Sequence, residues 1–382
     1  MLAKRLENLH PYVPGEQPKD RDYIKLNANE NPYPPHPSVT LALKEVLDSQ
    51  SAKLGLYPDP DANELRAAIA DMLNESGGVL NKAEVNGDCI SPSEGNAIPF
   101  KVTPDMIFCG NGSDEVLSFV FYTFFDSDRP LVFPEFTYSF YPVYCGYYNI
   151  PMERIPLKGD WSLDVEKMLD AAKKNNSSII FANPNAPTGI EMKRADVAAM
   201  IRRAPKDRVF IVDEAYCDFG EESCIPLLQE FENLVIVRTF SKSLSFAGMR
   251  LGYVVASPRL IDAIFTVKNS FNHFPVDFLA QRAGAASCRA AHYYAQNAKA
   301  VVREREALTD FLREKGWFVI PSHTNFVFAK KEGLSGEAIY QAVKKEGILI
   351  RHFATPGIED FVRITIGNQE QMKKLTEILG RM

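Results

Sequence analysis

The sequence lacks the signals that would place it in several functional classes. Its 382 residues contain no run of lysine and arginine and carry a formal net charge of −6, so no nucleic-acid partner is expected. The six cysteines form no Cys-x-x-Cys pair and no metal-site spacing, which predicts reduced, mostly buried thiols and no bound metal. The longest apolar run, Val116 to Phe125, is too short to cross a bilayer. The first residues lack the apolar centre of a signal peptide, so we expect a cytoplasmic protein.

A lysine follows a short apolar run that has the pattern of a buried strand. The run Leu234 to Val237 leads into the hydroxyl residues Thr239 and Ser241, then Lys242, with Arg250 eight residues later. Burial disfavours the charged form of a lysine, so an amine at this place needs a function. The amine could condense with a carbonyl cofactor while the hydroxyls and the guanidinium hold the phosphate of that cofactor. The alternative is a surface turn with a solvated lysine, since a lone lysine motif is only a hypothesis.

A second apolar strand, residues 209–213, ends in an acid. Asp213 can keep a pyridine nitrogen protonated, which makes the ring an electron sink. Tyr216, three residues later, can hydrogen-bond the phenolic oxygen of the same ring. Acids at strand ends are common in α/β proteins, so Asp213 alone is a weak signal. The ordered set of Asp213, Tyr216, Lys242 and Arg250 is much more specific, and it predicts that the first three are catalytic.

Five stretches spread over the chain carry a family resemblance. They are Leu26-Asn-Ala-Asn-Glu-Asn-Pro32, Tyr57-Pro-Asp-Pro60, Asn183-Pro-Asn-Ala-Pro-Thr-Gly189, Asp213-Glu-Ala-Tyr216, and Ser241-Lys242 with Arg250. In this order they resemble the pyridoxal 5′-phosphate (PLP) aminotransferases of fold type I (class I and II), and among these the histidinol-phosphate branch. The resemblance implies PLP on Lys242, a small-molecule amino donor, an oxo-acid acceptor, and a homodimer with shared active sites.

The resemblance also implies contacts to the cofactor that the residues alone leave open. The order of strand, glycine turn and helix around Gly112, Ser113 and Asp114 matches a phosphate cradle, because free N–H groups at a helix start attract phosphate. A simple turn between strand and helix is the alternative. Tyr138 matches an aromatic residue that stacks on the pyridine ring, with Phe136 as the other candidate.

Two further contacts to the cofactor are expected from the resemblance. Tyr57 matches a tyrosine whose hydroxyl reaches the cofactor phosphate of the partner subunit, whereas the residues alone favour a packed aromatic in a turn. Family members usually carry an asparagine directly before the second proline of the turn 183–189, where it contacts the ring oxygen. This chain has Ala186 at that place, so Asn185 is the expected replacement.

Strands and helices alternate through the first two thirds of the chain. This alternation predicts an α/β fold, here the fold of type I PLP transferases, with a mostly parallel central sheet and helices on both faces. Ligands of such sheets bind beyond the carboxyl ends of the strands. Gly112, Tyr138, Asn185, Asp213 and Lys242 each follow a predicted strand, which favours one common site.

Changes in composition predict three parts. A proline-rich extended arm covers residues 1–40, a large PLP-binding domain residues 41–275, and a smaller α+β C-terminal domain residues 276–382. With 46% apolar and 24% charged residues, a chain of this length can bury two cores. The polar residues 76–101 are interpreted as an inserted surface loop with a short hairpin.

Two arginines in the C-terminal part match an anion site. Arg363 matches the family's anion-binding arginine, which grips a substrate carboxylate in a bidentate manner in most relatives. In the histidinol-phosphate branch the group is a phosphate, and Arg351 matches a second arginine that suits its double charge. Tyr12 and Asn325 also match substrate-facing positions. Each arginine alone is equally compatible with a structural ion pair.

The expected reaction is a transamination in histidine biosynthesis, in which histidinol phosphate and 2-oxoglutarate give imidazole-acetol phosphate and L-glutamate. Lys242 then moves the proton of the substrate Cα. The alternatives are a threonine-phosphate decarboxylase, an aromatic amino-acid aminotransferase, and a PLP-binding regulatory module without activity. The arginine pair argues against substrates that carry only carboxylates, and the complete set of Lys242, Asp213 and Arg250 argues against a non-enzyme.

Overall fold

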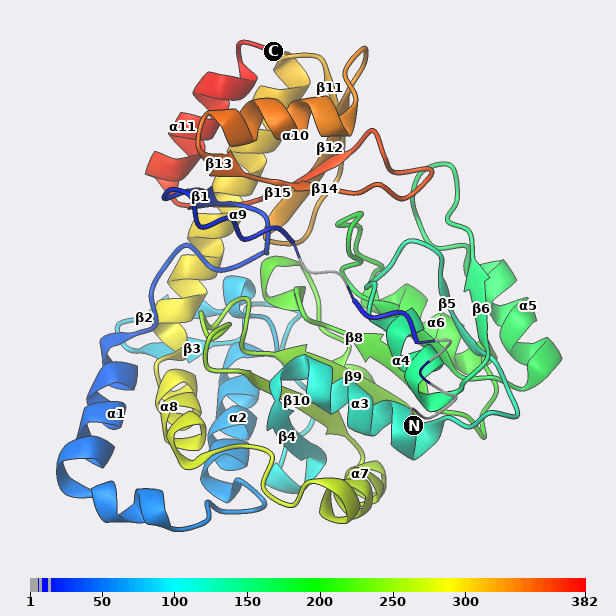
Figure 1. Ribbon diagram of the computed structural model, residues 1–382. Helices are drawn as coiled ribbons and strands as arrows, with labels where there is room; N and C mark the ends of the chain where they lie inside the picture. The colour runs from blue at the N-terminus through cyan, green and yellow to red at the C-terminus, as the bar shows by residue number, and fades with distance from the viewer. Residues whose placement is uncertain (1–5, 7–8, 13–14) are drawn as a thin grey trace.

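The protein consists of two bodies, each built on its own sheet and joined by the long helix α9 (Ala291–Glu314), as Figure 1 shows. The computed structural model describes residues 6, 9–12 and 15–382. The remaining residues of the predicted arm, 1–5, 7–8 and 13–14, lie outside the described residues. No helix in the described part of the chain is long and apolar enough to cross a membrane.

The larger body contains a seven-stranded sheet in the order β4-β10-β9-β8-β7-β5-β6. Strand β10 runs antiparallel to both of its neighbours, and the other neighbouring pairs are parallel. The strands are β4 (Ile107–Asn111), β5 (Leu131–Pro134), β6 (Met152–Ile155), β7 (Ile179–Ala182), β8 (Phe210–Asp213), β9 (Leu234–Thr239) and β10 (Leu251–Ala256). The predicted α/β fold with a mostly parallel central sheet is confirmed.

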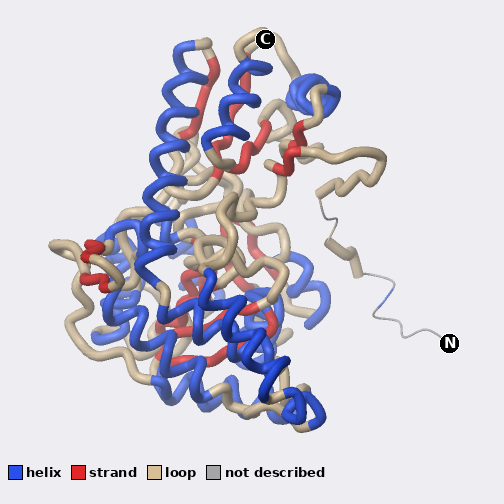
Figure 2. Tube along the Cα trace, turned by 90° about the vertical axis from the view of Figure 1, so that its left-hand side faces the viewer, coloured by secondary structure: helices blue, strands red, loops and turns tan. Residues whose placement is uncertain are grey.

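Both faces of this sheet are buried. Phe210 and Val212 join the apolar core on one face and Ile211 joins the core on the other, as the two-residue period of a strand requires. Figure 2 shows helices around the strands of this body. The helices are α1 (Pro37–Ser49), α2 (Asn63–Ser76), α5 (Val165–Asn175), α6 (Arg194–Arg203) and α8 (Phe278–Arg289) on the first side, and α3 (Gly112–Phe124), α4 (Tyr141–Tyr148) and α7 (Pro258–Phe271) on the second. Burial on both faces explains why the strands are almost continuously apolar.

The smaller body contains an antiparallel sheet in the order β11-β12-β15-β14. Its elements are β11 (Trp317–Ile320), β12 (Phe326–Lys331), α10 (Gly336–Lys345), β14 (Arg351–His352), β15 (Val362–Thr365) and α11 (Gln369–Leu379). Within α9, Ala295 still belongs to the core of the larger body, whereas Ala298 belongs to the core of the smaller one. The domain limits 41–275 and 276–382 stay a prediction, and this packing favours a limit within α9.

The described part of the arm packs on the smaller body of its own chain. Strand β1 (Ile24–Lys25) pairs in parallel with β13 (Ile348–Leu349), and Leu26 is buried in the core of the smaller body. The segment 76–101 holds the expected hairpin, formed by β2 (Glu84–Asn86) and β3 (Cys89–Ser91). The residues before this hairpin are buried against α9, so the segment is more than a surface loop.

Candidate active site

A cavity of about 630 Å³ lies where the carboxyl ends of the parallel strands face the smaller body. Among its lining residues are six that the sequence singled out, namely Tyr12, Tyr138, Tyr216, Lys242, Arg351 and Arg363. They come from the arm, from loops after β5, β8 and β9, and from the small sheet. Tertiary packing therefore brings six of the residues expected to bind cofactor and substrate into one wall.

Lys242 is half-buried in the wall, in the loop that follows β9. Its Nζ donates a hydrogen bond to the carbonyl oxygen of Ala28 at 3.4 Å and lies 5.7 Å from the centre of the Tyr216 ring. The backbone carbonyl of Lys242 accepts from Nδ2 of Asn31 at 2.9 Å. The hydroxyl of the next residue, Ser243, donates to Asp218 at 2.5 Å. These bonds fix the loop on both sides of the amine.

Asp213 is buried at the carboxyl end of β8. Its Oδ2 accepts from the hydroxyl of Tyr141 at 2.8 Å, and its Oδ1 accepts from the backbone N–H of Ala215 at 3.1 Å. Burial raises the pKa of the Asp213 carboxyl to about 6. A cation placed against this carboxylate would favour its ionised form, so the site suits a protonated ring nitrogen.

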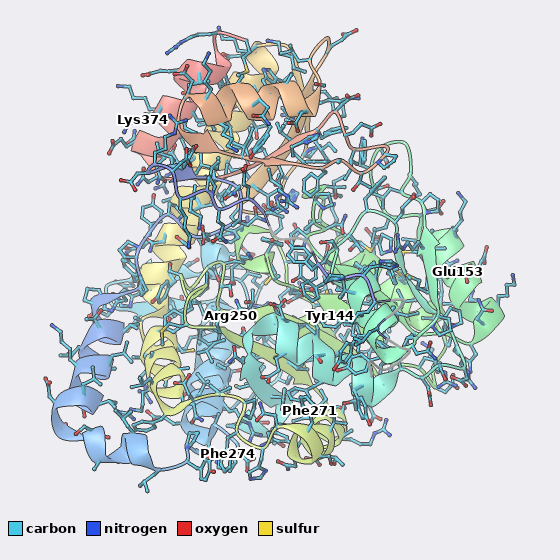
Figure 3. All side chains as sticks on the ribbon, in the orientation of Figure 1. Tyr144, Glu153, Arg250, Phe271, Phe274 and Lys374 are labelled. Carbon is cyan, nitrogen blue, oxygen red and sulfur yellow. The ribbon has the colours of Figure 1, made fainter. Side chains whose placement is uncertain are left out.

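A polar cluster gathers at the N-terminus of α3. Gly112 has a φ of +77°, and a Cβ at this residue would lie 2.6 Å from Nη2 of Arg250. The same Nη2 donates to Oδ2 of Asp114 at 2.8 Å, while the hydroxyl of Tyr138 donates to Oδ1 of Asp114 at 2.8 Å. Figure 3 labels Arg250 in the larger body, on the side toward the smaller body. Only glycine permits this close approach, and a guanidinium beside a helix N-terminus suits a phosphate.

Three further residues expected at the phosphate site are Ser113, Thr239 and Ser241. Ser113 is half-buried in the first turn of α3. Thr239 is buried at the end of β9 and Ser241 is buried directly before Lys242, and the backbone N–H of Ser241 donates to Oγ1 of Thr239 at 3.1 Å. This bond shapes the turn between β9 and the lysine.

The structure does not bring Asn185 to the cavity. Its Nδ2 donates to the carbonyl of Phe136 at 3.0 Å and to Oγ1 of Thr188 at 3.0 Å, and its Oδ1 accepts from Oγ1 of Thr137 at 3.1 Å. Both amide hydrogens of Asn185 are thus used, one by the loop after β5 and one within its own turn, and the NH₂ group has no third hydrogen for a ligand. Ala186, which stands at the usual asparagine position, lines the wall instead.

Several other expected residues also lie off the cavity wall, namely Asp213, the cluster of Gly112, Ser113, Asp114 and Arg250, the pair Thr239 and Ser241, and Tyr57 and Asn325. Tyr57 is 83% exposed and stacks on Phe274, with ring centres 4.5 Å apart. Figure 3 labels Phe274 at the lower edge of the larger body, far from the smaller one. Asn325 is fully buried, and its Nδ2 donates to the backbone carbonyl of Asn29 at 3.0 Å.

The arginine pair lies on the side of the cavity formed by the smaller body. The guanidinium of Arg363 lies 5.2 Å from the ring centre of Phe326 and 5.5 Å from that of Phe353, over which Arg351 also lies at 5.4 Å. Burial lowers the pKa of Arg363, and the charge of Arg351 lowers it further. In the described part of the chain Arg363 has no carboxylate partner, and its Nε has no hydrogen-bond partner. A bound anion would supply what this site lacks.

Comparison with known proteins identifies the family. Residues 21–379 match the family model described as aminotransferase class I and II. The chain belongs to the class I and II aminotransferases. This aminotransferase is 46% identical to the histidinol-phosphate aminotransferase of Syntrophus aciditrophicus (strain SB), covering 100% of this chain and 98% of that relative. It is 41% identical to histidinol-phosphate aminotransferase 1 of Bradyrhizobium diazoefficiens, covering 99% and 97%.

Solved structures share the fold of this aminotransferase. The histidinol-phosphate aminotransferase from Sinorhizobium meliloti in complex with pyridoxal-5′-phosphate superposes with a TM-score of 0.81 at 22% identity, covering 100% of this chain and 98% of that one. The aspartate aminotransferase from Thermus thermophilus with maleate gives 0.79 at 19% identity, covering 100% and 99%. These two likenesses confirm the predicted type I fold.

Sequence reasoning missed several residues that support the site of this aminotransferase. Asn29 donates from Nδ2 to the hydroxyl of Tyr216 at 2.8 Å, Asn31 holds the backbone of Lys242, and Tyr141 holds Asp213. Asn29 and Asn31 belong to the stretch that carried part of the resemblance, which was the available signal. Nothing in the local sequence marks Tyr141 among the aromatic residues around it.

Proposed function

We propose that this aminotransferase transfers the amino group of histidinol phosphate to 2-oxoglutarate, with PLP as its cofactor. The products are imidazole-acetol phosphate and L-glutamate, a step of histidine biosynthesis. The proposal is supported by the full-length relatives named above. The observation that carries it is the placement of Arg351 and Arg363 in the same cavity as Lys242.

The residues present fit PLP. Gly112 allows Arg250 to approach the N-terminus of α3, where a phosphate would be held, and Asp213 offers a carboxylate to a protonated ring nitrogen. PLP, when bound, withdraws electrons from the substrate Cα and so weakens its C–H bond. Tyr138 lines the cavity beside Asp114 and supplies an aromatic face.

Lys242 is the residue proposed to move the proton. Its Nζ would hold PLP by condensing with the carbonyl carbon of the cofactor, and it would be a free amine whenever a substrate amine occupies that carbon instead. The free amine then removes the proton of the substrate Cα as a general base. The bonds that Asn31 and Asp218 make to residues 242 and 243 keep the amine within reach of this atom.

Arg351 and Arg363 are proposed to bind the substrate phosphate. Their positive charges meet in a partly buried place, where a charge-assisted hydrogen bond is stronger than in water. Tyr12 lies on the wall nearby, with its ring 5.0 Å from that of Phe140. An anion held there fixes the amino end of the substrate toward Lys242.

We also propose a homodimer with shared active sites. Tyr57 is 83% exposed and is joined on the surface by Leu54 and Leu56, which are 48% and 69% exposed. A second copy that covers this surface would bring the Tyr57 hydroxyl to the cofactor phosphate of its partner.

All six cysteines are free thiols, which fits the proposed cytoplasmic location.

A half-reaction screen tests the proposed reaction. Candidate amines are added one at a time to the PLP form, and the loss of its visible absorbance is followed. Histidinol phosphate should convert the cofactor, while histidinol and aromatic amino acids should react far more slowly. The proposal fails if histidinol phosphate is inert, or if CO₂ is released from threonine phosphate without an oxo acid. A protein that shows no visible PLP band, before or after Lys242→Ala, would refute the cofactor assignment.

A further inference from the structure

Asn29 lies in a buried hydrogen-bond network that joins the arm, strand β15 and Tyr216. It is 1% exposed, and its backbone is left-handed with a φ of +55°. Its N–H donates to Oγ1 of Thr365 at 2.9 Å, and that hydroxyl lies 3.1 Å from Oδ1 of Asn29. Its Nδ2 donates to the hydroxyl of Tyr216 at 2.8 Å, and its carbonyl accepts from Asn325 at 3.0 Å. Each polar atom of Asn29 therefore has a hydrogen-bond partner.

The network fixes the direction of each hydrogen bond. The hydroxyl of Thr365 accepts from the backbone N–H of Asn29 and faces Oδ1 of its side chain, and because an amide oxygen can only accept, the hydroxyl donates its one hydrogen to Oδ1. This identifies the oxygen end of the amide, and the NH₂ end must face Tyr216. The hydroxyl of Tyr216 accepts at this contact. Its own hydrogen therefore points away from Asn29.

That hydrogen is available to a group in the cavity. In the described part of the chain, the Tyr216 hydroxyl forms its hydrogen bond with Asn29. The tyrosine is on the cavity wall, with Nζ of Lys242 5.7 Å from its ring centre. The ring also meets Phe326 edge to face, and the guanidinium of Arg363 lies 5.2 Å from the ring centre of Phe326. The ring of Tyr216 is thus near the amine of Lys242 and contacts the aromatic ring over which Arg363 lies.

We propose that Asn29 is a positioning residue that makes the Tyr216 hydroxyl a hydrogen-bond donor toward the phenolic oxygen of the cofactor, with Thr365 setting the direction of the Asn29 amide. This inference rests on the proposed function only in taking PLP as the group in the cavity. Thr365 and Arg363 are two residues apart on β15, so they point to the same face of the strand. Strand β15 thereby has two roles: Arg363 binds the substrate anion, and Thr365 orients Asn29 so that the Tyr216 hydroxyl donates to the cofactor.

Asn29→Asp tests the direction of the bond. The substitution keeps the shape of the side chain and a residue type that tolerates left-handed backbone. It replaces the NH₂ group with an acceptor, so the Tyr216 hydroxyl turns round and donates to the new carboxylate. A donor to the phenolic oxygen favours its ionised form. Its loss should raise the pH midpoint of the visible absorbance change of the holoenzyme by about one to two pH units.

A matched pair at Thr365 provides a second measurement that does not depend on the first. Thr365→Val keeps the volume but removes both bonds to Asn29, whereas Thr365→Ser keeps the hydroxyl. The pH midpoint of the absorbance change should be higher than that of the wild type in Thr365→Val and equal to it in Thr365→Ser. Thermal unfolding of each holoenzyme, recorded in the same buffers, separates this effect from a loss of stability, because a merely structural residue would lower the melting temperature without moving the midpoint.

A double variant decides whether the effect passes through Tyr216. Tyr216→Phe should raise the midpoint by itself, and Asn29→Asp should add nothing to it. An equal shift by Asn29→Asp with and without the tyrosine hydroxyl overturns the proposal, as does an unchanged midpoint in both Asn29→Asp and Thr365→Val. The titration contains no substrate. A failure of histidinol phosphate as amino donor would therefore refute the proposed substrate and leave this result standing.

Discussion

The buried carboxyl of Asp213 makes the stability of the cofactor-free protein depend on pH. Burial raises its pKa from an ordinary value of 3.8 to about 6. Between these two values the folded chain keeps a proton on Asp213 that the unfolded chain has released. The stabilisation is therefore complete below about pH 4 and is lost as the pH rises through 6. A shift of about two units corresponds to about 3 kcal/mol of unfolding free energy.

Asp213→Asn removes this dependence because the amide stays neutral. Its carbonyl oxygen can still accept from Tyr141, while the bond from the N–H of Ala215 is lost and lowers stability by about 1–3 kcal/mol at every pH. Between pH 4 and 7 the wild type should lose about 3 kcal/mol relative to the variant. Urea unfolding of both cofactor-free proteins across this range measures the difference, and titrations common to both cancel.

If the unfolding free energies of the wild type and of Asp213→Asn change with pH in the same way, the effect assigned to the burial of Asp213 is refuted.

The cofactor offers a second comparison, because a protonated ring nitrogen would keep Asp213 ionised. Saturating PLP should therefore remove the loss of stability between pH 4 and 7 in the wild type. The variant should bind PLP more weakly and show no such change. A wild-type slope that PLP leaves intact would contradict the pairing of Asp213 with the ring.

Further substitutions test other parts of the site. Lys242→Ala should lower kcat by at least about 10²–10⁴-fold, measured by glutamate formation, and addition of a small amine should restore part of the rate if the loss is that of a base. Arg363→Lys should raise KM for histidinol phosphate by about 10-fold or more, with little change for histidinol, because the bidentate contact to phosphate is lost; equal changes for both donors would contradict phosphate binding. Gly112→Ala should weaken PLP binding, since its Cβ meets Arg250, whereas Gly87→Ala has a similar φ of +61° and open space and should leave PLP binding unchanged.

The sequence predicted residues of the site best where those residues follow the carboxyl end of a strand. Gly112, Tyr138, Asp213 and Lys242 follow predicted strands, and the structure sets Tyr138 and Lys242 on one cavity wall together with Tyr216, whereas Gly112 and Asp213 lie off it. This works because parallel strands in an α/β sheet present their carboxyl ends at one edge. Asn185 also follows a predicted strand, but its amide is bound by Phe136 and Thr137 in the loop after β5 and by Thr188 in its own turn. Strand ends place a residue near the site, but its local hydrogen bonds decide where its side chain points.

By itself the sequence determined the α/β fold and predicted a lysine and an acid for the site, because hydrophobic periodicity and the order of short motifs are local properties of the chain. Only the tertiary structure decided which groups hold those residues in place. Asn29 is 187 positions from Tyr216 and 336 from Thr365, and Tyr141 reaches Asp213 of strand β8 from helix α4. A hydrogen bond needs its two atoms about 3 Å apart, and that coincidence depends on the packing of whole elements, which no local pattern records.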